Sequence, residues 1–214
     1  MNTYQTGSKK IFLLVLVILG WFALVAQLYL ILLNRSTTVL STIIRYVSFF
    51  TILTNFLVVV CSTVLLFYKK GRWVTFFSNP KTLTAIAMYI TIVGLVYNLI
   101  LRFLWQPEGL QLIVDELLHS AIPLLFIIFW SVFVPKAFLK AKDILPWLLY
   151  PLIYIIYILI RGSVNDVYPY PFIDVAALGY GKVIFNSGML VIVFVIFSLL
   201  FVWMDRKKRI KKII

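Results

Sequence analysis

The sequence is poor in acidic residues, cysteine and histidine, and this scarcity narrows the classes of function. Of its 214 residues, 7 are Asp or Glu, 1 is Cys and 1 is His. The single cysteine, Cys61, permits no disulfide within the chain, and together with the single histidine, His119, it leaves too few ligands for the usual zinc sites. Cys61 lies inside an apolar run, where we interpret it as a small buried thiol. The sequence indicates neither a metal nor a cofactor.

Apolar residues are abundant instead. They make up 63% of the chain, charged residues make up only 13%, and the mean hydropathy is +1.05. A soluble protein of this length cannot bury so many apolar side chains, whereas helices in a bilayer leave them facing lipid. The formal net charge is +13, but the basic residues separate apolar runs and do not form a stripe on a polar domain, so nucleic acid is not an expected partner.

Six apolar stretches suit helices that cross the hydrocarbon core, which requires about 20 residues each. The first follows Lys9 and Lys10, but it is longer than the apolar region of a signal peptide and lacks a small-residue cleavage site, so we expect it to be retained. No repeat or linker divides the chain. We therefore predict an all-α fold, a six-transmembrane-helix bundle in one domain of residues 1–214, with helices at about 11–33, 46–68, 83–104, 112–134, 145–160 and 183–204.

The distribution of Lys and Arg predicts the orientation. Of the 20 basic residues, 15 lie before the first helix, after the second and fourth, or after the sixth. Because basic loops stay in the cytoplasm, both termini are predicted to be cytoplasmic and the protein to be multi-pass in the inner (plasma) membrane. The five remaining basic residues, which fall on the outer side, are Arg35, Arg45, Arg102, Arg161 and Lys182.

Polar residues within the predicted helices also lie toward the outer side. Such side chains in hydrocarbon normally face the bundle interior or a water-filled cavity. We therefore predict a cavity open to the outer leaflet, whose candidate residues on the second, third and fourth helices are Arg45, Thr51, Thr54, Asn55, Asn98, Arg102, Asp115, Glu116 and His119.

The spacing of these residues suggests acyl-transfer chemistry. Thr51 and Asn55 are i,i+4 neighbours, as are Asp115 and His119, while Glu116 lies three residues before His119. A carboxylate one turn away orients a histidine, and hydroxyl, imidazole and carboxylate together are the groups that acyl transfer requires. Structural alternatives remain: a helical threonine often bonds its own i−4 carbonyl, an asparagine joins two helices, and a histidine near the interface bonds a neighbour.

Two further groups of residues have more than one interpretation. Arg45 and Arg102 are either interface anchors or a clamp for a carboxylate or phosphate head group. The segment Tyr168-Pro169-Tyr170-Pro171-Phe172 is stiffened by its prolines and is followed by Asp174. It forms either an aromatic belt at the interface or a cover across the cavity, in which case Tyr168, Tyr170 and Asp174 would contact the substrate.

Three motifs of this sequence resemble a known family. The residues Ser48-Phe49-Phe50-Thr51-Ile52-Leu53-Thr54-Asn55, His119-Ser120-Ala121-Ile122-Pro123 and Tyr168-Pro169-Tyr170-Pro171-Phe172-Ile173-Asp174 are similar to those of bacterial six-helix relatives of the androgen-induced-gene membrane proteins. Animal members are threonine hydrolases of fatty acid esters of hydroxy fatty acids. The resemblance implies that His119 is the essential histidine. The family threonine stands three residues before the asparagine, where this sequence has Ile52, so Thr51 is the nearest match and Thr54 the reserve.

These observations lead to a hypothesis with two alternatives. In the hypothesis, His119 takes a proton from Thr51, which attacks a fatty-acyl ester of a membrane lipid. Asp115 or Glu116 orients His119, Asn55 and Asn98 donate to the oxyanion, and Arg45 or Arg102 holds the head group. The first alternative is a non-catalytic lipid-binding or transport protein that uses the same cavity. The second is a metal hydrolase with His119, Asp115 and either Asp166 or Asp174 as ligands, which a single histidine disfavours.

Overall fold

The computed structural model describes residues 3–104, 106–136 and 138–210, and every regular element in these ranges is helical. The chain divides into two compact units, residues 1–135 and 136–214. Within the described ranges six helices are long and apolar enough to cross a membrane, four in the first unit and two in the second. The predicted all-α class and the predicted number of apolar helices are thus confirmed, and this set of helices suits an integral membrane protein. A single domain stays a prediction.

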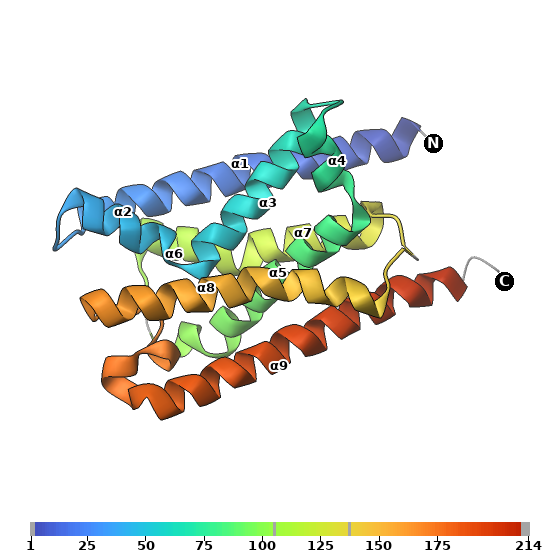
Figure 1. Ribbon diagram of the computed structural model, residues 1–214. Coiled ribbons are helices and arrows are strands. Elements are labelled where there is room, and N and C mark those ends of the chain that lie inside the picture. The colour runs from blue at the N-terminus through green and yellow to red at the C-terminus, as the bar shows by residue number, and fades with distance from the viewer. Residues whose placement is uncertain (1–2, 105, 137, 211–214) are drawn as a thin grey trace. The chain divides into compact units, whose positions relative to one another are not determined.

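The first unit is built around four long helical segments. Helix α1 packs against α3, α3 against α5, α5 against α7, and α7 against α1, which closes a ring of four neighbours (Figure 1). The short helices α2 and α6 lie at one end of this unit, and α4 lies at the other. Its elements are α1 Thr3–Leu33, α2 Val39–Val47, α3 Phe50–Phe67, α4 Arg72–Ser78, α5 Pro80–Leu99, η1 Leu101–Phe103, α6 Gly109–Glu116, η2 Leu117–Ala121 and α7 Ile122–Phe133.

Small residues and a few polar bonds hold the ring together. At Gly20 of α1, an added Cβ would lie 2.2 Å from Cγ2 of Val59 on α3, so the absence of a side chain permits this close approach. Such small residues let helix backbones pack tightly where no hydrophobic effect drives association. On the other side of the ring, Trp130 of α7 donates from Nε1 to Oγ1 of Thr84 on α5 at 2.8 Å.

The second predicted helix, at 46–68, is divided in the structure. Helix α2 ends at Val47 and α3 begins at Phe50, because Phe49 has an extended backbone with ψ 125° and the Ser48 hydroxyl donates to the Ile44 carbonyl at 2.6 Å. Tyr46 fastens α2 to α1 by donating to the Leu24 carbonyl at 2.8 Å, and burial raises the pKa of Tyr46 to about 12. The predicted helix therefore begins four residues too early, and the helix preceding it was not predicted.

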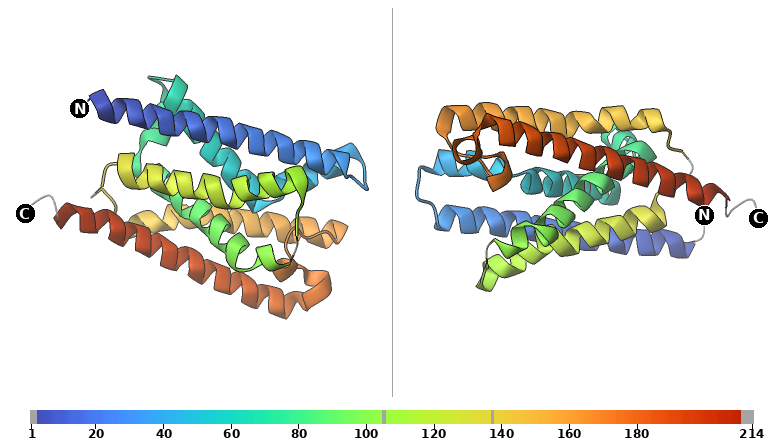
Figure 2. Two further views of the ribbon diagram at one scale, coloured as in Figure 1. Left: turned by 180° about the vertical axis from the view of Figure 1, so that it is seen from behind. Right: turned by 90° about the horizontal axis from the view of Figure 1, so that it is seen from below.

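The second unit contains two long helices that run side by side (Figure 2). Their ends are fastened by polar residues of the same unit: the buried carboxylate of Asp205 accepts a hydrogen bond from the backbone N–H of Leu139 at 3.0 Å. Gly179, with φ 74°, breaks the helical path near the start of α9. The elements are η3 Ala141–Asp143, α8 Ile144–Asn165, η4 Pro171–Ile173 and α9 Val175–Ile210.

Candidate functional site

The helical segment that carries His119 contains a π-helical turn, η2, between α6 and α7. Here the Ile122 N–H bonds to the Leu117 carbonyl, five residues back, and the next residue, Pro123, has no N–H to offer. In a regular α-helix the N–H groups at positions 122 and 123 would bond the carbonyls of Leu118 and His119, but the first is bonded elsewhere and the second is absent from proline. Both carbonyls consequently lose their usual partners inside a segment apolar enough to cross a membrane.

Two asparagines from neighbouring helices bond to these carbonyls. Nδ2 of Asn55, on α3, donates to the Leu118 oxygen at 3.0 Å, and Nδ2 of Asn98, on α5, donates to the His119 oxygen at 3.2 Å. Each amide uses its second hydrogen within its own helix, Asn55 on the Thr51 carbonyl at 2.9 Å and Asn98 on the Gly94 carbonyl at 2.8 Å. Donation to an oxyanion, the role expected for both residues, would require one of these bonds to break.

Helix α5 also approaches the π turn closely at a glycine. A Cβ added to Gly94 would lie 3.1 Å from the His119 carbonyl oxygen and 3.3 Å from Cβ of Pro123. That separation is tighter than ordinary van der Waals contact. Gly94 thus lets the Asn98 amide reach the His119 carbonyl.

The His119 ring is held from two directions. Its Nδ1 lies 3.0 Å from the Asp115 carbonyl oxygen and 3.8 Å from Asp115 Oδ1. Its plane stacks on the Tyr97 ring, with centroids 3.9 Å apart and an angle of 10° between the planes. Because a carbonyl only accepts hydrogen bonds, the neutral imidazole must carry its proton on Nδ1, which leaves Nε2 as the acceptor. In this tautomer the nitrogen that could act as a general base is Nε2.

The carboxylate of Asp115 is buried and belongs to a polar cluster that joins three helices. Tyr97 donates from its hydroxyl to Asp115 Oδ2 at 3.1 Å, and Gln111 Nε2 lies 3.5 Å from Oδ1. Gln111 also donates to Oε1 of Gln27, on α1, at 2.8 Å. Tyr97, Gln111 and Gln27 are not among the site residues predicted from the sequence. The two glutamines could have been found from the sequence, because each is an isolated polar residue within an apolar helix.

Arg102 and Glu116 form an ion pair beside this cluster. The side chains are 40% and 39% exposed, and Arg102 also donates to the Ser120 hydroxyl at 3.3 Å. Its guanidinium carbon lies 5.4 Å from the centroid of the Tyr97 ring. Of the two carboxylates proposed to orient His119, Asp115 contacts the ring and Glu116 pairs with Arg102.

The predicted nucleophile lies on the helix face that meets the π turn. Thr51 precedes Asn55 by one turn of α3, and Asn55 Nδ2 bonds to both the Thr51 and the Leu118 carbonyls, so the backbones on either side of that nitrogen are close. The side chains of Thr51 and Thr54 are buried. Arg45 is exposed on α2.

The remaining predicted site residues belong to the second unit. Asp174 caps α9 by accepting the Ala177 N–H at 3.0 Å. Tyr168 packs against Gly162 of α8, and Tyr170 stacks on Phe172 with ring centroids 5.2 Å apart. These contacts fold the segment onto its own unit. That Tyr168, Tyr170 and Asp174 share a site with His119 stays a prediction.

Comparison of the sequence with models of known protein families found no match, and comparisons with curated proteins and with solved structures also found none.

Proposed function

We propose that this chain is an integral membrane hydrolase of a fatty-acyl ester, with His119 as the proton acceptor and Thr51 as the nucleophile. The observation that carries the proposal is the bond between His119 Nδ1 and the Asp115 carbonyl, because it assigns the proton to Nδ1 and leaves Nε2 to act as a base. An ionisable residue within a membrane-spanning helix favours a functional role over a packing role.

The proposed reaction has two half-reactions. His119 Nε2 takes the proton of the Thr51 hydroxyl as its oxygen attacks the ester carbonyl, and the imidazolium returns that proton to the departing alcohol. Water, deprotonated by the same nitrogen, then cleaves the acyl–Thr51 ester and releases the fatty acid, while the imidazolium returns the proton to the Thr51 oxygen. The Asp115 carboxylate, 3.8 Å from Nδ1, stabilises the transient imidazolium.

The substrate class follows from where the site lies. Tyr97, Asp115 and His119 are within helices apolar enough to cross a membrane, so a substrate reaches them from lipid. The half-exposed Arg102 is the group proposed to hold a carboxylate or phosphate of the head group, in exchange for part of its pairing with Glu116. The resemblance to hydrolases of fatty acid esters of hydroxy fatty acids favours such an ester, and the predicted topology opens the site to the outer leaflet.

A non-catalytic lipid-binding or transport function is the second candidate. The observation that favours it is that both N–H groups of Asn55 and of Asn98 are already bonded to backbone carbonyls. Donation from these two amides to the developing negative charge, which stabilises acyl transfer, would therefore require existing bonds to break.

An active-site-directed fluorophosphonate separates the two candidates. The purified full-length protein is treated with the probe, and the labelled residue is located by mass spectrometry, while hydrolysis of a long-chain ester is measured in parallel. Labelling of Thr51 that requires His119 supports the hydrolase. Retention of lipid with neither labelling nor turnover would leave only the binding or transport function.

A further inference from the structure

The connection between α3 and α5 contains more than a turn. Antiparallel helices are commonly joined by about 2–8 residues, whereas here residues 68–79 include the separate helix α4. Phe77 of α4 is 3% exposed and packs inward, while Trp73 and Phe76 are 55% and 52% exposed. Two large aromatic side chains therefore face outward on an element that the connection itself does not require.

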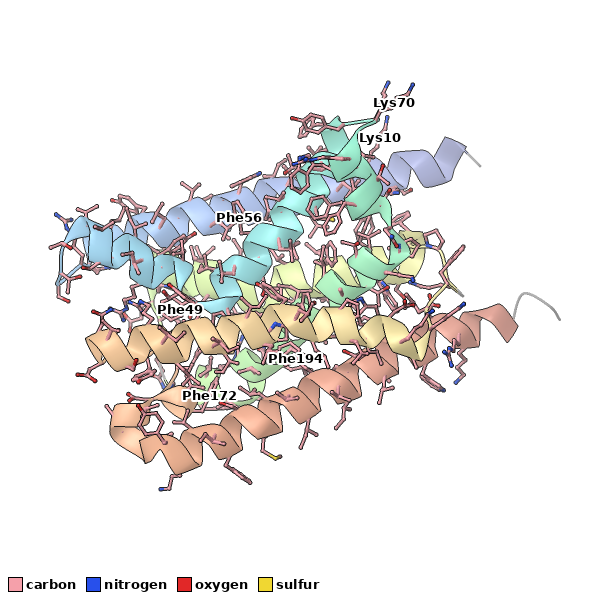
Figure 3. All side chains as sticks on the ribbon, in the orientation of Figure 1. Lys10, Phe49, Phe56, Lys70, Phe172 and Phe194 are labelled. Carbon is pink, nitrogen blue, oxygen red and sulfur yellow. The ribbon has the colours of Figure 1, made fainter. Side chains whose placement is uncertain are left out.

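Basic residues surround these aromatic side chains. Lys69, Lys70 and Arg72 are exposed at the start of α4, and Lys10 lies at the same end of the first unit as Lys70 (Figure 3). No acidic residue precedes Glu108 in the sequence, so no carboxylate of this part of the chain neutralises them. The guanidinium carbon of Arg72 lies 5.0 Å from the centroid of the Trp73 ring, which places charge and aromatic surface together.

We infer that the α4 surface, formed by Lys69, Lys70, Arg72, Trp73 and Phe76, lies in the membrane–water interface and binds the head groups of anionic phospholipids. Trp and Tyr are enriched at that depth because their apolar rings carry an N–H or O–H that faces water, and basic residues beside them attract anionic lipid. Phe67 and Tyr68, at the end of α3, are 65% and 62% exposed and continue the aromatic surface toward the hydrocarbon. This inference rests on membrane insertion of the six apolar helices and is independent of the proposed hydrolase.

An anionic lipid is the ligand that fits both the basic residues and the exposed aromatic rings of the α4 surface. A nucleic acid or an acidic protein would satisfy the charges, but it would leave Trp73 and Phe76 facing water beside the hydrocarbon boundary. An uncharged lipid would cover the rings without neutralising the three cations. An anionic phospholipid satisfies both, with its phosphate near Lys69, Lys70 and Arg72 and its glycerol and upper acyl region against the rings.

The test measures lipid binding to the full-length protein in detergent by native mass spectrometry, with phosphatidylglycerol and phosphatidylcholine as probes. The wild type should prefer phosphatidylglycerol, and Lys69→Gln/Lys70→Gln should weaken its binding about 25-fold, since each basic residue near such a surface contributes about fivefold. The matched control Arg35→Gln/Lys182→Gln removes the same charge on the side predicted to be opposite and should change this affinity less than twofold.

A second variant tests the aromatic half of the surface. Trp73→Ala/Phe76→Ala should also weaken phosphatidylglycerol binding, and quenching of Trp73 by brominated phosphatidylglycerol should exceed quenching by brominated phosphatidylcholine, with Trp73→Phe as the background. Equal affinity for the two lipids, an equal loss in the matched control, or competition by inorganic phosphate at the concentration of the lipid would each overturn the inference.

Discussion

Asn98 on α5 donates a hydrogen bond to the backbone oxygen of His119, with Nδ2 and oxygen 3.2 Å apart. The residue four positions after His119 is Pro123, which has no N–H for that oxygen. The asparagine thus replaces a bond that the proline removes, and this replacement fixes the backbone of the only histidine against a second helix. Polar side chains and local π turns are among the means by which proline is accommodated in a helix within a membrane.

Replacing Asn98 with leucine should therefore destabilise the protein by about 1 kcal/mol, because a buried carbonyl loses its partner. The same substitution in a Pro123→Ala background should cost less than half as much, since the alanine provides a backbone N–H for the His119 oxygen. Unfolding free energies of the four proteins in one detergent mixture measure the difference. Equal costs in the two backgrounds would show that the asparagine does not compensate for the proline.

Gly94→Ala should destabilise the first unit by about 1–3 kcal/mol, the usual cost of overpacking. The added methyl group would lie 3.1 Å from the His119 oxygen, which belongs to the backbone and has little freedom to move away. Gly188→Ala is the matched control, because it is also a helical glycine and has no atom within 4 Å of the added Cβ. The control should be neutral or stabilising by up to about 1 kcal/mol, and an equal loss in both variants would contradict a contact-specific effect.

The apolar helices were predictable because the solvent imposes their length. About 20 apolar residues must be continuous to cross hydrocarbon, whatever the neighbouring helices are. The division at Ser48 and Phe49 and the π turn at Leu117–Ala121 were not predicted. Both depend on hydrogen bonds specific to this fold, such as that from Tyr46 to Leu24. Hydropathy along the sequence does not predict such bonds.

The candidate site was predictable only where its partners share a helix. The i,i+4 spacing of Asp115 and His119 predicted that the two residues lie together, but the bond at 3.0 Å is to the Asp115 backbone carbonyl, and the carboxylate lies 3.8 Å from Nδ1. Stacking of Tyr97 on His119 joins two helices, and so do the bonds of Asn55 and Asn98 to the π turn. Their pairing follows from how the helices rotate against one another, which periodicity along one helix does not determine.

The predicted orientation can be measured with topology reporters. Fusions after Tyr68, Val134 and Met204 should report the cytoplasm, and fusions after Leu33, Leu104 and Ile160 should report the opposite side, because Lys and Arg concentrate in the first set of segments. Six helices alternate in direction only if each crosses the membrane. A cytoplasmic signal after Ile160 would contradict the six-helix topology.

The proposed hydrolase mechanism can be tested directly by substituting its nucleophile and its base. Thr51→Ala and His119→Ala should each lower turnover of a long-chain ester by several orders of magnitude, and the double variant should lose little more than either single one, because nucleophile and base act as a unit. Thr54→Ala, which removes a buried hydroxyl from the next turn of α3, is the matched control and should retain activity. A loss confined to Thr54→Ala would move the nucleophile to that residue and keep His119 as the base. Wild-type protein that retains bound lipid but shows neither turnover nor probe labelling would rule out the hydrolase, and anionic-lipid binding at the α4 surface would still be tested separately by its own variants.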